Sequence, residues 1–462
     1  MSVAGGRPDV QWRCRAALAG DLDVDALGLA PAAGSSESDD DGMSETELEL
    51  LISNNTGMQL SFLGTCAVEY GKIRSSNSVA LRLGKSIWLL DCGEDTQRQL
   101  MRQPHIRHGK IDRIFITSLD GENILGLPGM LCSLSSARVK GQEIADMPLH
   151  LYGPPGLAEY IRAMLQVSDT YLEMPVLVHE LMPHAVRERD AEPYCLNPRA
   201  RLWALQLAPD ELNPVGYYDG DLRAFLNRHK GRKRNMRDLR SSYRELMLPP
   251  PGDASRTDVA VEDMTWTIKC GNEYAMSIRR LPHVRPSFGL ALQEADSSGR
   301  LDAASAASLG VEGRQFSALK EGRDVTTRDG RVVKAADVVG PDRPGRKIVV
   351  LGDTTDATPL ASWGADADLV VAGVSTSGLE GRVTAERLAC CAGRFAAAVD
   401  AENLVLTRCP PAVGDAAEDA KEALIRQAAK TAGKAWVLAA EDLLLISVQR
   451  REVANAPGLG DC

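Results

Sequence analysis

Short apolar stretches alternate with segments of helical pattern along most of the chain. Strands are predicted at 58–65, 78–83, 86–91, 111–117, 149–152, 347–351, 369–372 and 403–407. Helices are predicted between them, at 96–102, from 127 onward, at 385–399 and at 415–432. Strands that alternate with helices in two halves of a chain indicate an α/β fold, with stacked sheets and helices on their outer faces.

Both ends of the chain depart from this pattern. Residues 1–57 are predicted to be a tail, either disordered or carrying a targeting signal, because 35–41 is a polar acidic run of the kind that stays solvated. Arg7, Arg13 and Arg15 favour an organelle signal, whereas the aspartates among them argue against one. Residues 446–462 are predicted to be a C-terminal tail.

Two internal segments also interrupt the core pattern. Residues 190–265 are predicted to be a basic insertion, because 228–240 carries seven basic residues in thirteen. Dense positive charge of this kind suits RNA phosphates, although a solvated insertion is the other interpretation. Residues 292–345 are rich in glycine and charge and are predicted to be a second excursion from the core. The RNA-binding candidates are Arg228, Lys230, Arg232, Lys233, Arg234 and Arg237.

Composition narrows the class of protein. The net charge of −10 excludes a generic nucleic-acid binder, so any RNA contact must come from a local basic patch. No apolar run approaches the roughly 20 residues that cross a bilayer, so no membrane partner is expected. The ten cysteines form no CxxC pair, which indicates reduced thiols inside a cell. Cytoplasm, nucleus and an organelle such as the mitochondrion all stay open.

Several phrases occur in an order that resembles a known family. They are Phe62-Leu63-Gly64-Thr65, Leu90 to Leu100, Lys110 to Thr117, Gly126 to Gly129, Tyr152-Gly153-Pro154, His283 to Gly289 and Leu351 to Thr354. Together they resemble ribonuclease Z (tRNase Z), a family of tRNA 3′-processing endonucleases with the metallo-β-lactamase fold. The resemblance covers about 58–445 and implies an αββα sandwich. In the family, an arm that grips RNA follows His283, and 292–345 keeps its outline.

Within the phrase from Leu90 to Leu100, the residues suggest mainly structural roles. Asp91 and Thr96 are predicted to cap the helix that follows, since their side-chain oxygens can accept bonds from its first amides. Gly93 is predicted to permit the turn between strand and helix.

The metal-binding motif of the family has lost its histidines here. The family pattern Thr-His-X-His-X-Asp-His corresponds to residues 117–123, which are Thr-Ser-Leu-Asp-Gly-Glu-Asn. Ser118, Asp120 and Asn123 therefore stand at histidine positions. Glu122 stands at the position of the catalytic aspartate and is one methylene longer.

The more distant ligand positions have changed in the same direction. Arg382 and Arg408 stand where the resemblance implies further histidines. His283 and Asp353 are the retained metal-ligand positions, and Asp353 matches the aspartate that bridges two metals. An arginine cannot ligate a cation and repels one nearby. Loss of the family's dinuclear zinc site is therefore predicted.

Three interpretations of the altered site are open. In the first, Arg382 and Arg408 pair with Asp353, Asp120 and Glu122 in an ion-pair network. In the second, the oxygen-rich set of Asp120, Glu122, His283 and Asp353 holds a single Mg²⁺ or Mn²⁺. In the third, the arginines hold an anion such as phosphate.

The leading functional hypothesis is a ribonuclease Z-like pseudoenzyme without zinc-dependent phosphodiesterase activity and without a cofactor. It would act as an RNA-associated or scaffold subunit. The RNA would be tRNA or another structured RNA. The protein partner would be another subunit, an active paralogue or, in a dimer, a second copy of the chain. The alternative is an active tRNA 3′-endonuclease whose metal site is altered or completed by a partner chain.

Overall fold

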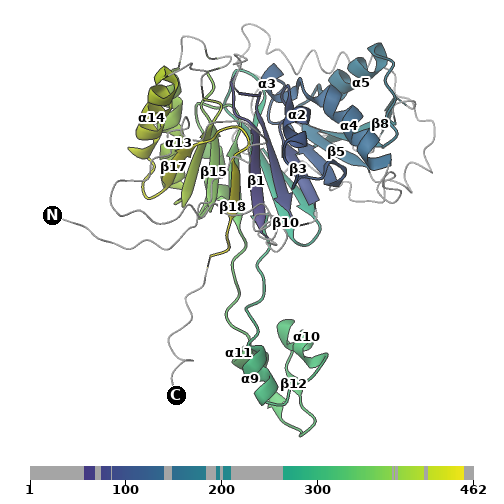
Figure 1. The fold of residues 1–462 in the computed structure, drawn as a ribbon, viewed down its shortest axis with the longest axis vertical. Helices are drawn as coiled ribbons and strands as arrows, with labels where there is room; N and C mark the ends of the chain where they lie inside the picture. The colour runs from purple at the N-terminus through teal and green to yellow at the C-terminus, as the bar shows by residue number, and fades with distance from the viewer. Residues whose placement is uncertain are drawn as a thin grey trace, which may run out of the picture.

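The computed structural model describes residues 57–67, 74–84, 86–139, 148–183, 194–197, 201–209, 264–376, 379, 383–409 and 415–451. Within them, two mixed sheets face each other and carry helices on their outer sides (Figure 1). The predicted strands and helices of the core lie where the apolar pattern placed them, to within a few residues. The basic run 228–240 lies outside the described residues.

The first sheet has the strand order β18-β1-β2-β3-β4-β5-β6-β8-β7. Its strands are β1 (Met58–Gly64), β2 (Ser78–Leu83), β3 (Ser86–Leu90), β4 (Ile111–Phe115), β5 (Leu149–Gly153), β6 (Val176–Leu181), β7 (Tyr194–Asn197), β8 (Leu202–Leu207) and β18 (Leu445–Val448). Helices α2 (Thr96–Met101), α4 (Leu127–Val139) and α5 (Leu157–Val167) cover its outer face, where Leu100, Met130 and Ile161 are fully buried.

The second sheet has the order β17-β16-β15-β14-β11-β10-β9. Its strands are β9 (Thr265–Cys270), β10 (Tyr274–Leu281), β11 (Ser287–Glu294), β14 (Lys347–Leu351), β15 (Leu369–Gly373), β16 (Asn403–Thr407) and β17 (Trp436–Ala439). Helices α13 (Ala385–Ala398) and α14 (Asp415–Ala429) cover its outer face through buried residues such as Phe395 and Ala428. Side chains of both sheets, Trp88 and Phe288 among them, form the core between the layers.

The polar residues predicted to matter follow the carboxyl ends of parallel strands. Strands β3 and β4 pair in parallel in the first sheet, as do β14, β15 and β16 in the second. The carboxyl ends of parallel strands share one edge of a sheet, where α/β proteins build their sites. The Phe288 amide donates to the Thr117 carbonyl at 2.9 Å and joins the two sheets at this edge. The short helix α3 (Gly121–Ile124) lies directly after the β4 loop.

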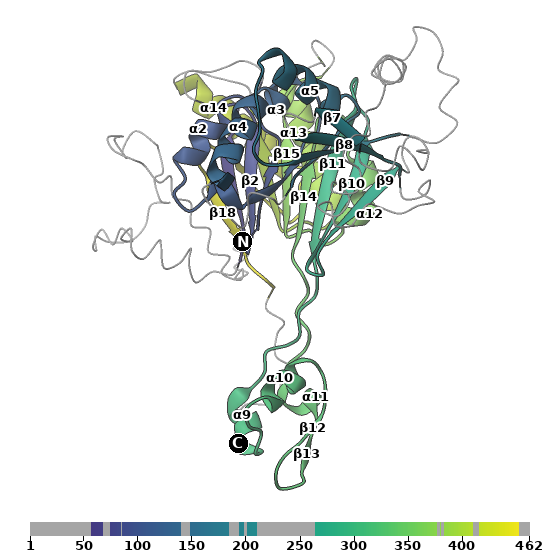
Figure 2. The same ribbon diagram turned by 90° about the vertical axis from the view of Figure 1, so that its right-hand side faces the viewer.

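A small arm leaves the body between β11 and β14 and projects far from it (Figures 1 and 2). The arm contains α9 (Ala303–Ser308), α10 (Gln315–Lys320), α11 (Ala335–Val338), β12 (Val325–Thr326) and β13 (Val332–Val333). Its own apolar cluster includes the buried Ala306, Leu319 and Val338. Strand β11 begins beside the candidate site and ends at the arm, so the arm and the site lie at opposite ends of the body.

The C-terminal boundary predicted at residue 446 is wrong. Strand β18 continues to Val448 and pairs antiparallel with β1, with Met58 opposite Val448. Ile446 and Val448 alternate into the core between the sheets, and their burial keeps the segment in place. No helix in the described part of the chain is long and apolar enough to cross a membrane.

Candidate functional site

The guanidinium of Arg408 lies at the centre of the candidate site. Arg408 follows β16 and is 2% exposed. Its Nη1 lies 2.7 Å from Oδ1 of Asp353, after β14, and 3.3 Å from Oε1 of Glu122, in α3. The backbone of Arg408 is left-handed (φ 54°), which costs an L-residue about 1 kcal/mol. The surrounding ion pairs offset this strain and join elements from both halves of the chain.

Gly373, at the end of β15, makes room for this guanidinium. A Cβ at Gly373 would lie 2.5 Å from Cζ of Arg408 and closer still to two of its nitrogens. The guanidinium therefore lies flat against the backbone of β15, and any side chain there would displace it. The resemblance places a glutamate of a His-Glu-Ala phrase at this position, so the glycine and the arginine fit each other.

One guanidinium here faces two buried carboxylates. Burial raises the pKa of the Glu122 carboxyl to about 7, against the lowering effect of Arg408. Burial alone would lower the pKa of Arg408, but the Asp353 and Glu122 carboxylates outweigh it and raise the pKa. Oε2 of Glu122 and Oδ2 of Asp353 are buried and have no hydrogen-bond partner among the described residues. Glu122 therefore binds a proton more readily than an exposed glutamate does.

The residues at the former histidine positions satisfy one another. Asn123 donates to the hydroxyl of Ser118 at 2.9 Å, and this hydroxyl donates to Oδ2 of Asp120 at 2.9 Å. Asn77 donates to the side-chain oxygen of Asn123, also at 2.9 Å. Arg285 pairs with Oδ1 of Asp120, although its side chain is 62% exposed. Each polar group in this chain of bonds is thus engaged by a neighbour.

Asp91 does not cap the following helix, contrary to the prediction. Its carboxylate accepts bonds from the amide of Thr117 at 2.7 Å, from the Thr117 hydroxyl, and from Asn77 at 2.9 Å. Burial raises its pKa to about 7, against these bonds and Arg408. Asp95 occupies the N-cap position of α2 without a side-chain bond, and Thr96 donates to the Gly93 carbonyl instead. Asp91 fixes the start of the altered motif.

Gly93 is needed for close approach. A Cβ there would overlap the backbone oxygen of Glu122 and lie 2.5 Å from Cβ of Ser76. The turn after β3 therefore packs directly against α3 at Gly93. This contact fixes the position of the Glu122 backbone, and so the position from which its side chain reaches the site.

His283 lies at the rim of the site, between β10 and β11. Its Nδ1 accepts a bond from the Arg285 amide at 3.4 Å, and its Nε2 is buried without a partner among the described residues. The hydroxyl of Thr354 donates to the Pro282 carbonyl at 3.0 Å and so links this loop to the one that carries Asp353. His283 and Asp353, the two predicted ligand positions, therefore come from neighbouring loops.

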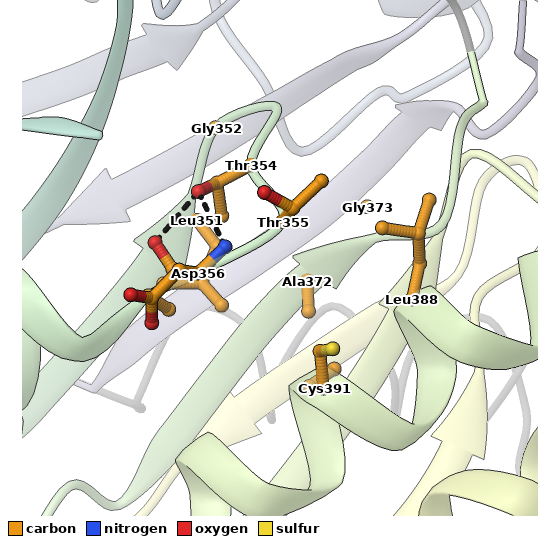
Figure 3. Close-up of a pocket in the computed structure, with 11 residues that line it drawn as sticks. Leu351, Gly352, Thr354, Thr355, Asp356, Ala372, Gly373, Leu388 and Cys391 are labelled. Atoms are coloured by element: carbon orange, nitrogen blue, oxygen red, sulfur yellow. Dashed lines mark hydrogen bonds between the residues drawn. The ribbon is translucent and has the colours of Figure 1, made fainter. Parts of the chain in front are cut away.

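A small pocket opens beside the site, between the loop after β14, the end of β15 and helix α13 (Figure 3). Thr354, Thr355, Asp356 and Cys391 supply its polar side chains. The Asp356 amide donates to the Thr354 hydroxyl at 3.0 Å, and the oxygen of this hydroxyl lies 2.7 Å from the Asp356 carbonyl oxygen. These groups stabilise the turn of the loop that presents Asp353.

The sequence of the chain is similar to those of known proteins. The chain is 31% identical over 297 residues to zinc phosphodiesterase ELAC protein 1 of Mus musculus, covering 64% of this chain and 69% of that protein. The chain belongs to the ribonuclease Z family. It is also 29% identical over 318 residues to ribonuclease Z of Lactiplantibacillus plantarum, covering 68% of this chain and 74% of that protein. No family model matches the chain.

Among solved structures, the human short-form tRNase Z (ELAC1) is 22% identical, with a TM-score of 0.47 over 85% of this chain and 99% of that one. The predicted metallo-β-lactamase fold is confirmed by the family relationship together with the two facing sheets and their outer helices. In ribonuclease Z terms, the two facing sheets are the ββ layers and the outer helices are the α layers.

The residues present do not fit the two zinc ions of the ribonuclease Z family. Zinc prefers imidazole and thiolate ligands in tetrahedral geometry, with carboxylates in supporting roles. In the part of the chain that is described, no three His, Cys, Asp or Glu side chains are arranged to hold a metal ion. Arg408 is paired with the carboxylate of Asp353, and Arg285 is paired with the carboxylate of Asp120.

The structure thus brings together most of the predicted site residues, with different pairings. Ser118, Asp120 and Asn123 form one network, and Glu122, Asp353 and Arg408 form another. Arg382 lies outside the described residues, as do Arg228, Lys230, Arg232, Lys233, Arg234 and Arg237. Sequence reasoning missed Arg285, Gly373 and Asn77. The signal for Gly373 was available, because this glycine, at the end of β15, stands where the resemblance implies a glutamate of the family phrase.

Proposed function

We propose that this chain is a ribonuclease Z-like pseudoenzyme that works by binding, as an RNA-associated or scaffold subunit. The observation that carries the proposal is the Arg408 guanidinium held between Glu122 and Asp353. A phosphodiester-cleaving metal site of this fold needs a cation against these oxygens. A fixed positive charge already bonded to them opposes the entry of a second one.

The state of the altered motif supports the same proposal. Ser118, Asp120 and Asn123 are hydrogen-bonded to one another, and Ser118 and Asn123 are poor zinc ligands. For a single Mg²⁺ or Mn²⁺, Asp120 and Asp353 would first have to leave Arg285 and Arg408. The ion-pair network is therefore favoured over a hard cation.

A binding role is supported by what the chain retains. The arm keeps an apolar cluster of its own, although it lies at the opposite end of the body from the site. Strand β11 alone, at about 3.3 Å per residue, separates the two by more than 20 Å. An RNA held by the arm would therefore be presented to another subunit. An active paralogue or a second copy of this chain is the partner that this geometry suits.

Cleavage of a 3′-extended precursor tRNA tests the loss of activity. Purified protein is incubated with this RNA in zinc, manganese or magnesium, and we expect no specific 3′ product. Asp353→Ala and Asp356→Ala are compared, because both lie in one loop but only Asp353 faces Arg408. Specific cleavage that Asp353→Ala abolishes and Asp356→Ala preserves would establish the alternative, an active endonuclease with an altered site.

Metal content gives an independent test. After equilibration with zinc and removal of excess, we expect well under one tightly bound ion per chain. A chelator is expected to leave the thermal unfolding midpoint unchanged, since structural metals stabilise the folded state by mass action. Two tightly bound zinc ions per chain would contradict the pseudoenzyme.

RNA binding is tested by charge neutralisation. Replacing Arg232, Lys233 and Arg234 by Gln is expected to weaken tRNA binding and to reduce the salt slope by roughly two. In the matched control, Arg426, Lys430 and Lys434 are replaced by Gln. This removes the same charge from α14 and the turn that follows it. Unchanged tRNA affinity after the Arg232, Lys233 and Arg234 replacement, or no binding by the unaltered chain, would instead favour a scaffold without RNA contact.

A further inference from the structure

The arm is joined to the body by two closely packed chain segments. The Ser297 amide donates to the Arg343 carbonyl at 3.0 Å, and the Arg343 amide donates back at 2.8 Å. Further out, the Gly340 amide donates to the Arg300 carbonyl at 3.0 Å. Gly299 and Gly345 have no room for a Cβ, because the opposite backbone lies against them. These two segments, 295–302 and 339–346, form the stalk of the arm. The stalk is a narrow two-stranded ribbon, and its direction is set where it meets the body.

A buried ion pair holds the two segments together where the stalk meets the body, a junction called the arm root below. Nε and Nη2 of Arg346 donate to the two oxygens of Glu294, each at 2.8 Å. The side chains are 5% and 6% exposed. Two parallel bonds of this kind fix orientation as well as distance. Because Glu294 ends the outgoing strand β11 and Arg346 directly precedes the returning strand β14, this pair clamps both connecting segments together.

The segment that follows β18 adds a third point of attachment. Arg346 donates to the Val448 carbonyl at 3.0 Å, and Arg450 lies 2.7 Å from Oε1 of Glu294. Arg450 also donates to the hydroxyl of Ser297. The next residue, Arg451, binds the body instead, at 2.8 Å from Asp368 and 3.1 Å from Glu402. Adjacent arginines thus hold the arm root and the body.

We propose that Arg450 is a positioning residue that fastens the arm root to the C-terminal strand and so fixes the direction of the arm. Without Arg450, the ion pair of Glu294 and Arg346 remains at the arm root. The bonds that Arg450 makes to Glu294 and to Ser297 are lost. The arm then turns more freely about the root. The part of this inference that concerns RNA rests on the proposed function.

Hydrogen exchange of the full-length chain without RNA tests the fastening. Arg450→Met is expected to speed amide exchange at Ser297 and Arg343 by about tenfold, the effect of losing one charged hydrogen bond. Arg451→Met is the control, since it removes the same charge one residue away, and is expected to change these two amides less than twofold. Arg450→Lys keeps the charge but not the fork and is expected to fall between them. Equal exchange in the two Met variants overturns the proposal.

Binding of a 3′-extended precursor tRNA then separates this inference from the proposed function. Arg450→Met is expected to weaken binding at least about threefold more than Arg451→Met, although both lose one positive charge. If the unaltered chain binds no tRNA, the RNA role fails while the exchange result still decides the fastening. If exchange differs but affinity does not, Arg450 holds the arm without positioning RNA, and the positioning role is overturned.

Discussion

Replacement of Arg408 by methionine is the most informative perturbation of the site. Methionine keeps much of the volume but removes the charge that both Asp353 and Glu122 face. Removing one partner of a buried ion pair costs about 3–5 kcal/mol, because the remaining charge stays out of water. We therefore expect the free energy of unfolding to fall by about 4 kcal/mol at pH 8.5.

The loss should depend on pH, and its direction follows from the pKa of Glu122. That pKa is already raised to about 7 by burial, and removal of the guanidinium raises it further. A carboxyl whose pKa is higher in the folded state stabilises that state at low pH, and the contribution is lost as pH rises through the folded value. At pH 5.5 Glu122 is protonated, so the loss should shrink to about 2 kcal/mol.

Urea unfolding at the two pH values measures both numbers, provided that the slope with denaturant is unchanged. Arg285→Met is the control from the same site. Its pair with Asp120 involves a side chain that is 62% exposed, so its loss should cost less than about 1 kcal/mol. A cost below about 1 kcal/mol for Arg408→Met at pH 8.5, or an equal cost at both pH values, would refute the reasoning.

Two further predictions concern the same cluster. Gly373→Ala is expected to displace the guanidinium and destabilise the fold by about 3 kcal/mol, whereas Gly109→Ala, whose nearest neighbour would lie 3.9 Å away, should change stability by less than about 1 kcal/mol; similar unfolding midpoints for the two variants would contradict this. Glu122→Gln removes the carboxyl with the raised pKa, so a pH series of unfolding midpoints should show a gain of about 2 kcal/mol over the unaltered chain at pH 8.5 and almost none at pH 5. If Glu122→Gln is less stable than the unaltered chain at pH 8.5, the prediction is contradicted. The ionised Glu122 would then be stabilised by Arg408 by more than its burial costs.

The sequence alone predicted the sheets and the position of the site, because strand patterns and family phrases are local. The predicted loss of zinc ligands follows from residue identity at each position, and it stays a prediction. It did not predict that Arg285 pairs with Asp120, because these residues are 165 positions apart and meet only through the packing of the two sheets. The role of Asp91 was missed for a similar reason. A carboxylate near a helix start suggests a cap, but the loop after β4 places the Thr117 amide 2.7 Å from Oδ1 of Asp91.

Under the proposed loss of the metal, the pairings at the site favour its replacement by protein contacts over simple decay. Loss of zinc ligands without compensation would leave buried carboxylates facing one another, a cost of several kcal/mol. Here a guanidinium lies between Glu122 and Asp353, and a glycine at 373 leaves the room that it needs. The pairs connect α3, on the first sheet, with β14 and β16 of the second, which is the structural connection that a bridging metal would otherwise provide. The arginine therefore keeps the edges of the two sheets together while the carboxylate that would bridge two cations is already bound.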